Sequence, residues 1–311
     1  MKGLKKIALV AAVAAAPFAA NAELQALNDA SMGAVTGQAG VTIDLSANVT
    51  IGEIAYEDQG FLAFSDVSIS GQGGTDLDDI RLTIDVAGDT TNRDLGTAAL
   101  GATYLAGAGF DVSGANETAQ SVTDGDLVIG LRSQSGLPVD FNLSIGEIFL
   151  SKTGSTVGSL QSRANGGTGG TTLVSDLSID GFLGPIDIVI NEESNSLNVN
   201  AYFSAEGNLT MPFMGTSLDF ELHNRRGATV AGTVAGTDYS FAHAQVDVSV
   251  VDSHNAGTAL APNNISALRV NVQDFSGDLD LTNINTGGTE SIGNVYMTDL
   301  AVRADMVIYG H

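Results

Sequence analysis

Two short acidic turns hold the residues best suited to bind a metal ion. Asp76, Asp78 and Asp79 follow a pair of glycines in the first turn, and Asp124 and Asp126 flank a glycine in the second. Carboxylate oxygens are the ligands that calcium prefers in proteins. Neither turn has the ligand spacing of an EF-hand loop, and neither is repeated in tandem as in calcium-binding β-rolls. We therefore predict at most one calcium site, at these turns, against the alternative of a solvated acidic surface.

Residues for covalent or acid–base catalysis are not arranged in any motif that we identify. The chain has no cysteine and no Gly-x-Ser-x-Gly motif. Its histidines have neither i,i+2 nor i,i+4 spacing to one another, and we interpret them as surface residues rather than metal ligands: His223, His243, His254 and His311. These patterns predict a protein that is not an enzyme and that needs no cofactor, with calcium as the exception.

The elements that carry these residues are predicted to be strands. From Val41 to Ile51, apolar and polar residues alternate without a break. A strand points successive side chains to opposite faces, so this segment has one apolar and one polar face. The same alternation recurs at 80–86, 127–131, 139–145, 186–190, 197–205, 218–222, 244–250, 268–272 and 300–308. The sequence predicts an all-β protein with a large, mainly antiparallel sheet or sandwich, and a closed β-barrel as the alternative.

The alternation also predicts which side chains are buried, if the apolar face is the covered one. The predicted core then consists of apolar residues from the first strands: Val41, Ile43, Leu45, Val49, Ile51, Ile80, Leu82, Ile84, Phe141, Leu143 and Ile145. On the same reasoning, Thr42 and Ser46 belong to the solvated face.

Two short motifs recur in the same order along the chain. The first, with the pattern N-x-x-I-G-E-I, occupies residues 48–54 and 142–148, with a looser copy at 291–295. The second, with the pattern S-D-x-S-I, occupies 65–69 and 175–179, with a looser copy at 298–302. We interpret each pair as two strands of one hairpin unit, bent at its glycine. Glu53 and Glu147 of the first motif are interpreted as solvated residues rather than as a catalytic pair.

The N-terminal region has the features of an export signal. Lys2, Lys5 and Lys6 precede an apolar run, and Ala20-Asn21-Ala22 is a small-x-small cleavage site. We predict a signal peptide at 1–22, a short helical segment at 23–37 with a helix from Asn28 to Val35, and a single extended β domain with internal repeats at 38–311. The alanine-rich region 94–109 is predicted to be a helix or a packed loop.

Charge and cysteine content limit the partners of the chain. The formal net charge is −24, with 36 acidic and 12 basic residues. Such a charge repels nucleic acid and anionic lipid head groups. The absence of cysteine rules out disulfide bonds, so stability has to come from the buried sheet. The apolar run of the signal is too short to span a bilayer, and no transmembrane helix is predicted.

The segment from Leu27 to Ile43 resembles a family of exported Gram-negative proteins of unknown function. The matching residues are Leu27, Asp29, Met32, Val35-Thr36-Gly37-Gln38, Gly40-Val41 and Ile43. Some members of that family are assigned to a pilus system of the Fil type. The resemblance implies export and a role in surface filaments, and it supplies no catalytic residues.

We therefore predict a non-enzymatic, exported structural or surface protein, a component of a pilus or filament system that assembles through β-edges. Val41, Ile43 and Leu45 are the candidate assembly residues, because an unpaired strand near a chain terminus can accept another strand; the alternative is that this strand pairs within its own sheet. The predicted partners are further copies of the chain or other surface proteins, and the predicted location is the periplasm, the cell surface or the medium. An outer-membrane β-barrel and an exported ligand-binding module are the alternatives.

Overall fold

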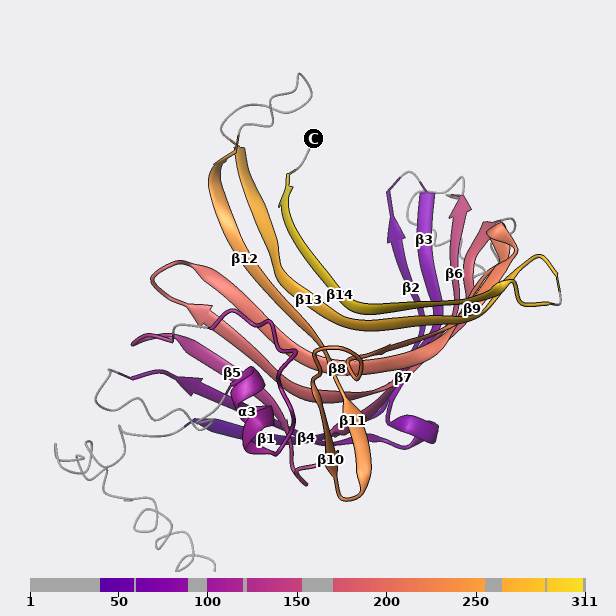
Figure 1. Ribbon diagram of the computed structural model, residues 1–311. Coiled ribbons are helices and arrows are strands. Elements are labelled where there is room, and N and C mark those ends of the chain that lie inside the picture. Colours follow the sequence, from indigo (N-terminus) through magenta and orange to yellow (C-terminus); the bar gives the residue numbers. More distant parts are fainter. Residues whose placement is uncertain are drawn as a thin grey trace, which may run out of the picture. The chain divides into compact units, whose positions relative to one another are not determined.

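Alternating apolar and polar residues form long strands in the computed structural model of the protein (Figure 1). The structure describes residues 40–58, 60–88, 100–119, 122–152, 170–254, 265–288 and 290–309. Its strands are β1 (Val41–Ala47), β2 (Val49–Glu57), β3 (Gly60–Ser70), β4 (Leu77–Val86), β5 (Leu127–Ser133), β6 (Val139–Lys152), β7 (Gly170–Asn191), β8 (Ser196–Met211), β9 (Thr216–His223), β10 (Ala231–Val234), β11 (Thr237–Ser240), β12 (Ala242–His254), β13 (Ile265–Thr286) and β14 (Gly293–Ile308). One helix, α3 (Gly101–Gly107), and two 3-10 turns, η1 (Gln72–Gly74) and η3 (Pro212–Met214), complete the described elements.

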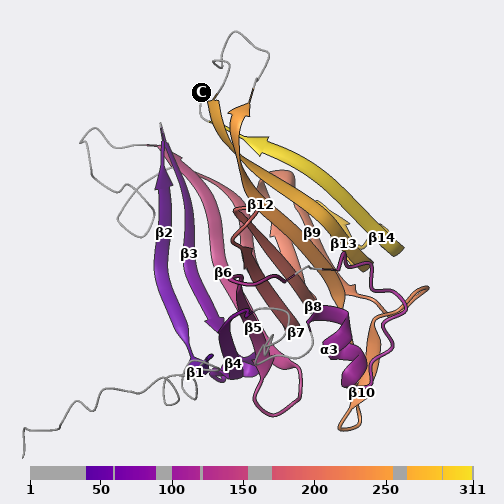
Figure 2. The ribbon, with the colours of Figure 1, turned by 90° about the vertical axis from the view of Figure 1, so that its left-hand side faces the viewer.

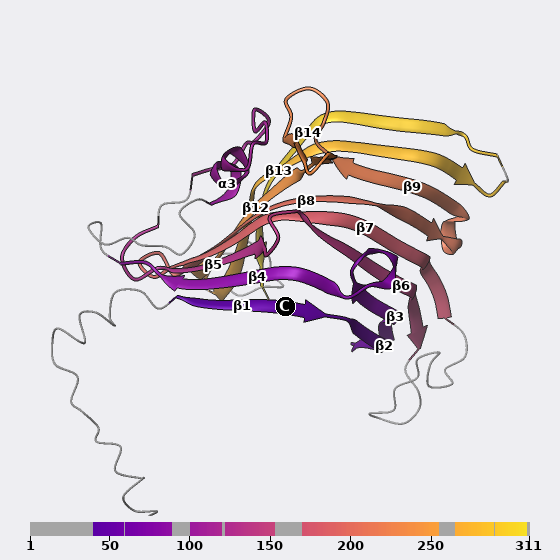
Figure 3. The same cartoon turned by 90° about the horizontal axis from the view of Figure 1, so that it is seen from below.

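Twelve strands form one antiparallel sheet, and β10 and β11 form a separate hairpin. Four pairs of strands lie end to end, and each pair fills one row of the sheet: β1 with β2, β3 with β4, β5 with β6, and β9 with β12. The strands β7, β8, β13 and β14 fill one row each, so four double rows and four single rows make eight. Each row pairs with the next one along the chain, from β1 and β2 at one edge to β14 at the other (Figure 3).

The row made of β9 and β12 is interrupted by residues 224–241, which we call the insertion and which contain the β10–β11 hairpin. Both β9 and β12 pair with β8 on one side and with β13 on the other, so these four strands form a small closed circuit. Among the described residues, β1, β2 and β14 each pair on one side only. The predicted all-β class with a large antiparallel sheet is confirmed, and closure is confined to the four-strand circuit.

One face of the sheet is apolar from edge to edge, and we call it the apolar face. Three ladders of paired residues cross all eight rows on this face, and every member is apolar or glycine. They are Val41-Ile84-Ile129-Ile188-Val199-Val246-Val272-Ala304, Ile43-Leu82-Leu131-Ile186-Ala201-Ala244-Phe275-Val302 and Val49-Ile69-Leu143-Ile179-Gly207-Phe220-Leu281-Val295. None of these residues is buried within the described part of the chain.

The opposite face, which we call the polar face, is the better covered one. Its ladder Thr42-Thr83-Gly130-Asp187-Asn200-Gln245-Asp274 is buried over its last five members. Two segments lie over it, residues 100–119 with α3 and the insertion, and together we call them the cover. A cluster of buried residues joins the cover to Tyr202 of the sheet: Leu105, Phe110, Val230 and Phe241. Figure 2 shows α3 in front of the strands.

The predicted core is therefore largely wrong. Val41, Ile43 and Leu45 are 52%, 42% and 39% exposed, Val49 and Ile51 are also exposed, and of the predicted core residues Ile80 alone is buried. Alternation shows that the two faces of a strand differ, but the connections between strands decide which face is covered. Here residues 100–119 and the insertion pack on the polar face, so its polar side chains are buried and form hydrogen bonds to the cover and to one another.

Three local predictions also need correction or placement. The segment 41–51 is not one strand, because β1 ends at Ala47 and β2 begins at Val49. The region 94–109 contains α3 at Gly101–Gly107, which agrees with the helix prediction for its described part. The predicted helix from Asn28 to Val35 and the signal peptide lie outside the described residues.

The repeated motifs form paired strands in two of their three copies. Gly52 lies opposite Asp66 between β2 and β3, and Gly146 lies opposite Asp176 between β6 and β7. In the third copy the second motif and residues 293–295 of the first lie in the single strand β14, so the hairpin interpretation is wrong there. The aspartate of the second motif has a left-handed backbone in every copy, with φ of 50°, 52° and 54° at Asp66, Asp176 and Asp299. Aspartate tolerates this conformation better than most residues, and register shifts mark a bulge beside Asp176 and beside Asp299.

Candidate functional site

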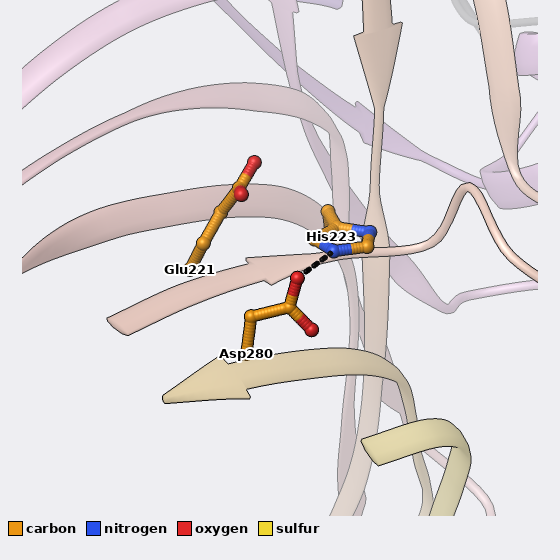
Figure 4. A group of neighbouring side chains, drawn as sticks. All are labelled: Glu221, His223 and Asp280. Atoms are coloured by element: carbon orange, nitrogen blue, oxygen red, sulfur yellow. Dashed lines mark hydrogen bonds and ion pairs between the residues drawn. The ribbon is translucent and has the colours of Figure 1, made fainter. Parts of the chain in front are cut away.

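Three residues of the polar face come close enough to hold a metal ion, Glu221 and His223 on β9 and Asp280 on β13 (Figure 4). One ligand atom from each lies within 4.8 Å of the others. Strand alternation explains the group, because Glu221 and His223 are two residues apart on one strand and Glu221 pairs directly with Asp280 on the next. The Nε2 atom of His223 lies 3.3 Å from a carboxylate oxygen of Asp280.

Two arginines already bind the carboxylates of this group. Arg225 donates to both oxygens of Glu221 at 2.6 and 2.7 Å, and Arg226 donates to both oxygens of Asp280 at 2.9 and 2.6 Å. The Arg225 guanidinium holds the pKa of Glu221 below its ordinary value, and Arg226 does the same for the pKa of Asp280. A metal ion would have to displace both bidentate pairs. The group therefore has the chemistry of an ion-pair network.

The neighbouring Asp278 shows what this network does for the fold. Its side chain is fully buried, and its oxygens accept hydrogen bonds from the backbone N–H groups of Arg225 at 3.0 Å, Arg226 at 2.7 Å and Asp299 at 3.1 Å. A carboxylate oxygen also lies 3.3 Å from Nδ1 of His223. Asp278 thus ties the first residues of the insertion to β13 and to the bulge in β14. The network fixes the point where the chain leaves the sheet.

A cavity of about 540 Å³ lies beside this network, between the polar face and the insertion. Its lining includes Glu221 and His223, four further acidic residues and an aromatic pair: Asp111, Asp180, Glu206, Asp238, Phe182 and Tyr239. Phe182 and Tyr239 meet edge to face at 5.0 Å. The paired residues Asp180, Glu206, Glu221 and Asp280 place carboxylates side by side on four adjacent rows. Arg225 also lines the cavity, and Arg225 and Arg226 compensate the charges of Glu221 and Asp280.

A second polar network forms hydrogen bonds to residues 100–119, the other segment of the cover. His243 is fully buried, with Nδ1 at 2.8 Å from Asp274 and Nε2 at 2.7 Å from Asn200. Glu117 of the cover accepts hydrogen bonds from Asn200 at 2.8 Å and from the Tyr202 hydroxyl at 3.0 Å. Burial, with the nearby Glu117 charge, raises the pKa of Tyr202.

An Asp–His pair of this kind could activate a nucleophile, but the described neighbours of His243 offer none. The hydroxyl of Ser276 donates to Asp274 at 2.7 Å rather than to the histidine. At the start of α3, Asp187 accepts a hydrogen bond from the N–H of Gly101 at 2.7 Å and forms an ion pair with Arg132 at 2.5 Å. Burial raises the pKa of Asp187, against the opposing charge of Arg132. These bonds position the cover, and they create no open reaction site.

The five aspartates predicted as calcium ligands are not brought together. Asp79 lies in β4 directly before Ile80, which pairs with Ser133 at one end of the β4–β5 pairing, whereas Asp126 precedes Leu127 at the opposite end. Both carboxylates cap turns. Asp79 accepts hydrogen bonds from Ser133 and Ser135, and Asp126 accepts them from Thr123, Asn191 and Glu192. The remaining members, Asp76, Asp78 and Asp124, are exposed. Calcium binding at these turns stays a prediction.

The pKa of Asp126 shows that its capping bonds are strong. Burial on its own raises the pKa of this carboxyl group, but the hydrogen bonds from Thr123, Glu192 and Asn191 outweigh burial and leave the pKa below its ordinary value. Asp126 is therefore held in its charged form as a structural acceptor.

The interpretation of the histidines as surface residues is wrong for His223 and His243, which are both buried. A search for histidine pairs misses them because their partners are carboxylates on neighbouring strands. The signal present in the sequence is Glu221-Leu222-His223 together with Asp278-Leu279-Asp280, two strand segments with ionisable residues on the same face. Glu53 and Glu147 do not meet, because both pair with Ser65 of β3 from opposite sides.

The predicted assembly residues Val41, Ile43 and Leu45 lie on the edge strand β1, which pairs with β4 alone among the described strands. Their side chains belong to the exposed apolar face. The described residues thus present two candidate sites, the acidic cavity under the insertion and the apolar face with its free edges.

Comparison with known protein families gives a match for the N-terminal part of the chain. Residues 1–88 match a family of unknown function, DUF6160. The matched part includes β1, β2, β3 and β4. No curated protein and no solved structure matches the chain. Within the described residues, no helix has the length and apolar character needed to cross a membrane.

Proposed function

We propose that this protein is a non-enzymatic, exported structural protein that works by associating with further copies of itself, as a component of a surface filament system. The observation that carries the proposal is the apolar face. Three complete ladders cross eight rows without one charged or polar side chain, and none of their residues is buried within the described chain. A surface of this kind is stable in water when another molecule covers it.

The size of the apolar face supports an association surface. The eight rows lie about 4.8 Å apart, and the strand rises about 3.3 Å per residue from Val41 to Val49. The rectangle between the outer rows and the outer ladders therefore has an area of about 900 Å². The largest apolar patch of an ordinary monomer is about 300–600 Å², and a standard interface buries about 800 Å² per partner. The remaining surface carries the net charge of −24, which keeps other contacts weak through mutual repulsion.

Sedimentation velocity of the purified protein over a dilution series tests this proposal. We expect species larger than a monomer that dissociate on dilution. Val250, 62% exposed on the apolar face, is the position to perturb, and Val250→Lys should weaken association at least about tenfold because a charge enters an apolar contact. The matched control is Ser249→Lys, which adds the same charge to the polar face of the same strand. A monomer at every concentration would contradict the proposal.

Membrane association is the second candidate, because an apolar face backed by a covered polar face is also the pattern of an outer-membrane sheet that contacts lipid. Flotation with neutral phosphatidylcholine vesicles separates the two. Self-association predicts that the protein stays at the bottom of the gradient. Flotation that is lost in Val250→Lys and kept in Ser249→Lys would replace self-association with lipid contact.

A further inference from the structure

The sheet ends in two free edges that are complementary to each other. The first row, β1 with β2, and the last row, β14, each lack a second partner among the described strands. We propose that copies of the chain join head to tail, with β14 of one copy pairing antiparallel with β1 and the start of β2 of the next. This inference rests on the proposed self-association, and it adds a joint between the sheet edges to the contact over the apolar face.

Strand direction permits this joint without turning either copy over. All neighbouring rows are antiparallel, so directions alternate along the sheet. With eight rows, the first and the last run in opposite directions. A second copy placed beside the first in the same orientation therefore meets β14 with an antiparallel strand, and the alternation of the sheet continues across the joint.

The levels of the two edges also match. Three ladders of paired residues cross the whole sheet. In each ladder a residue of the first row lies at the same level as a residue of β14, that is, on the same line across the strands. Val41 shares its ladder with Ala304, Ile43 with Val302, and Val49 with Val295. A neighbour at the same level would place apolar residues opposite apolar residues at all three positions. Such cross-strand pairs stabilise a sheet.

Charge on the polar side of the joint is complementary as well. Arg303 of β14 lies between Val302 and Ala304, is exposed, and makes no ion pair among the described residues. At the proposed joint it faces Thr42 of the next copy and is diagonal to Asp44, which already accepts hydrogen bonds from Arg81 at 2.7 and 2.9 Å. Diagonal neighbours on adjacent strands are about 7–8 Å apart between Cα atoms, within reach of an arginine side chain. The joint thus places a second cation beside the Asp44–Arg81 pair.

The consequence is an open-ended assembly. A joint between two different surfaces leaves a free β14 at one end and a free β1 at the other, so each added copy provides the site for the next. The apolar ladders continue from copy to copy, and the apolar face becomes a continuous strip along the filament. A joint between like edges would instead close after two copies.

The absence of cysteine makes this geometry directly testable by disulfide cross-linking. Ile43→Cys and Val302→Cys are made as separate variants of the full chain. Both side chains are 42% exposed, so the substitutions should leave the fold intact, which circular dichroism checks. Facing residues of antiparallel strands have Cα atoms about 4.5–5.5 Å apart, within the range that a disulfide spans. Val250→Cys, on the apolar face of an interior row, is the matched control.

We expect mild oxidation of an equal mixture of the Ile43→Cys and Val302→Cys proteins to give a cross-linked dimer, and each protein alone to give none. The double variant should give a ladder of higher multimers. Homodimers from either single variant would overturn the proposal, because like edges would then meet. Cross-linking by Val250→Cys alone, with none in the mixture, would overturn the head-to-tail joint and leave self-association standing. No cross-link together with a monomeric protein would overturn both.

Discussion

Replacing Asp278 with alanine should destabilise the protein more than any change at its exposed aspartates. The substitution removes a fully buried carboxylate and leaves the N–H groups of Arg225, Arg226 and Asp299 without their acceptor. Each unsatisfied buried donor costs about 1–3 kcal/mol, and the three donors share one carboxylate. Because these terms overlap, we expect a loss of about 3–5 kcal/mol in the free energy of unfolding.

Urea denaturation followed by circular dichroism measures this loss, and hydrogen exchange locates it. Protection should fall first in the insertion, residues 224–241, because Asp278 anchors its first residues to β13. Asp278→Asn keeps one acceptor oxygen and should lose about half as much stability as Asp278→Ala. The matched control is Asp124→Ala, which removes an exposed turn aspartate and should change the free energy by less than about 0.5 kcal/mol.

Two results would refute this reasoning. If Asp278→Ala cost no more than Asp124→Ala, the three hydrogen bonds would contribute nothing to the folded state. If the stability fell as expected but exchange rose evenly over the whole sheet, Asp278 would stabilise the sheet as a whole rather than anchor the insertion.

Three further outcomes follow from burial and charge. Ile80→Ala should cost about 2–5 kcal/mol in urea denaturation, whereas Ile43→Ala, on the exposed face, should cost less than about 1 kcal/mol; equal losses would restore the original core prediction. The pKa values of Glu221 and Asp280 are lowered in the folded state, so their contribution to stability is complete above their ordinary values of 4.5 and 3.8 and is lost as pH falls through the lowered ones. Arg226→Gln should reduce this acid-dependent loss in a pH series of melting curves. Sodium chloride should raise the melting temperature, because it screens repulsion among charges that sum to −24 over distances of about 10 Å at 0.1 M; a fall would argue against self-repulsion.

Local sequence patterns account for the strands and for the hairpin units. The alternation at 80–86, 139–145 and 244–250 lies within β4, β6 and β12, because side-chain direction in a strand depends on residue number alone. The repeated S-D-x-S-I motif also has a local cause, since its aspartate takes the same left-handed backbone in all three copies. The third repeat fails as a hairpin because its second motif and residues 293–295 of its first lie in one strand, β14.

The candidate site could be predicted only in part, because its residues are far apart in the chain. The sequence predicts Asp79 and Asp126 to lie at turns, and in the structure both cap turns. The pairing of Asp278 with Arg225 and Arg226 joins segments more than fifty residues apart, with separations of 53 and 52. No spacing rule within one strand reports such a contact, because it depends on which strands become neighbours.

The sequence by itself determines that the chain forms strands with one apolar and one polar face, since this property belongs to each segment separately. Only the tertiary structure decides which face is covered. Glu117, Leu105 and Phe110 of residues 100–119, and Val230 and Phe241 of the insertion, bind or pack against the polar side of the sheet. Ile43 is left exposed and His243 becomes buried for the same physical reason: the burial of a strand residue depends on what packs against its face, and that is a property of long-range connections.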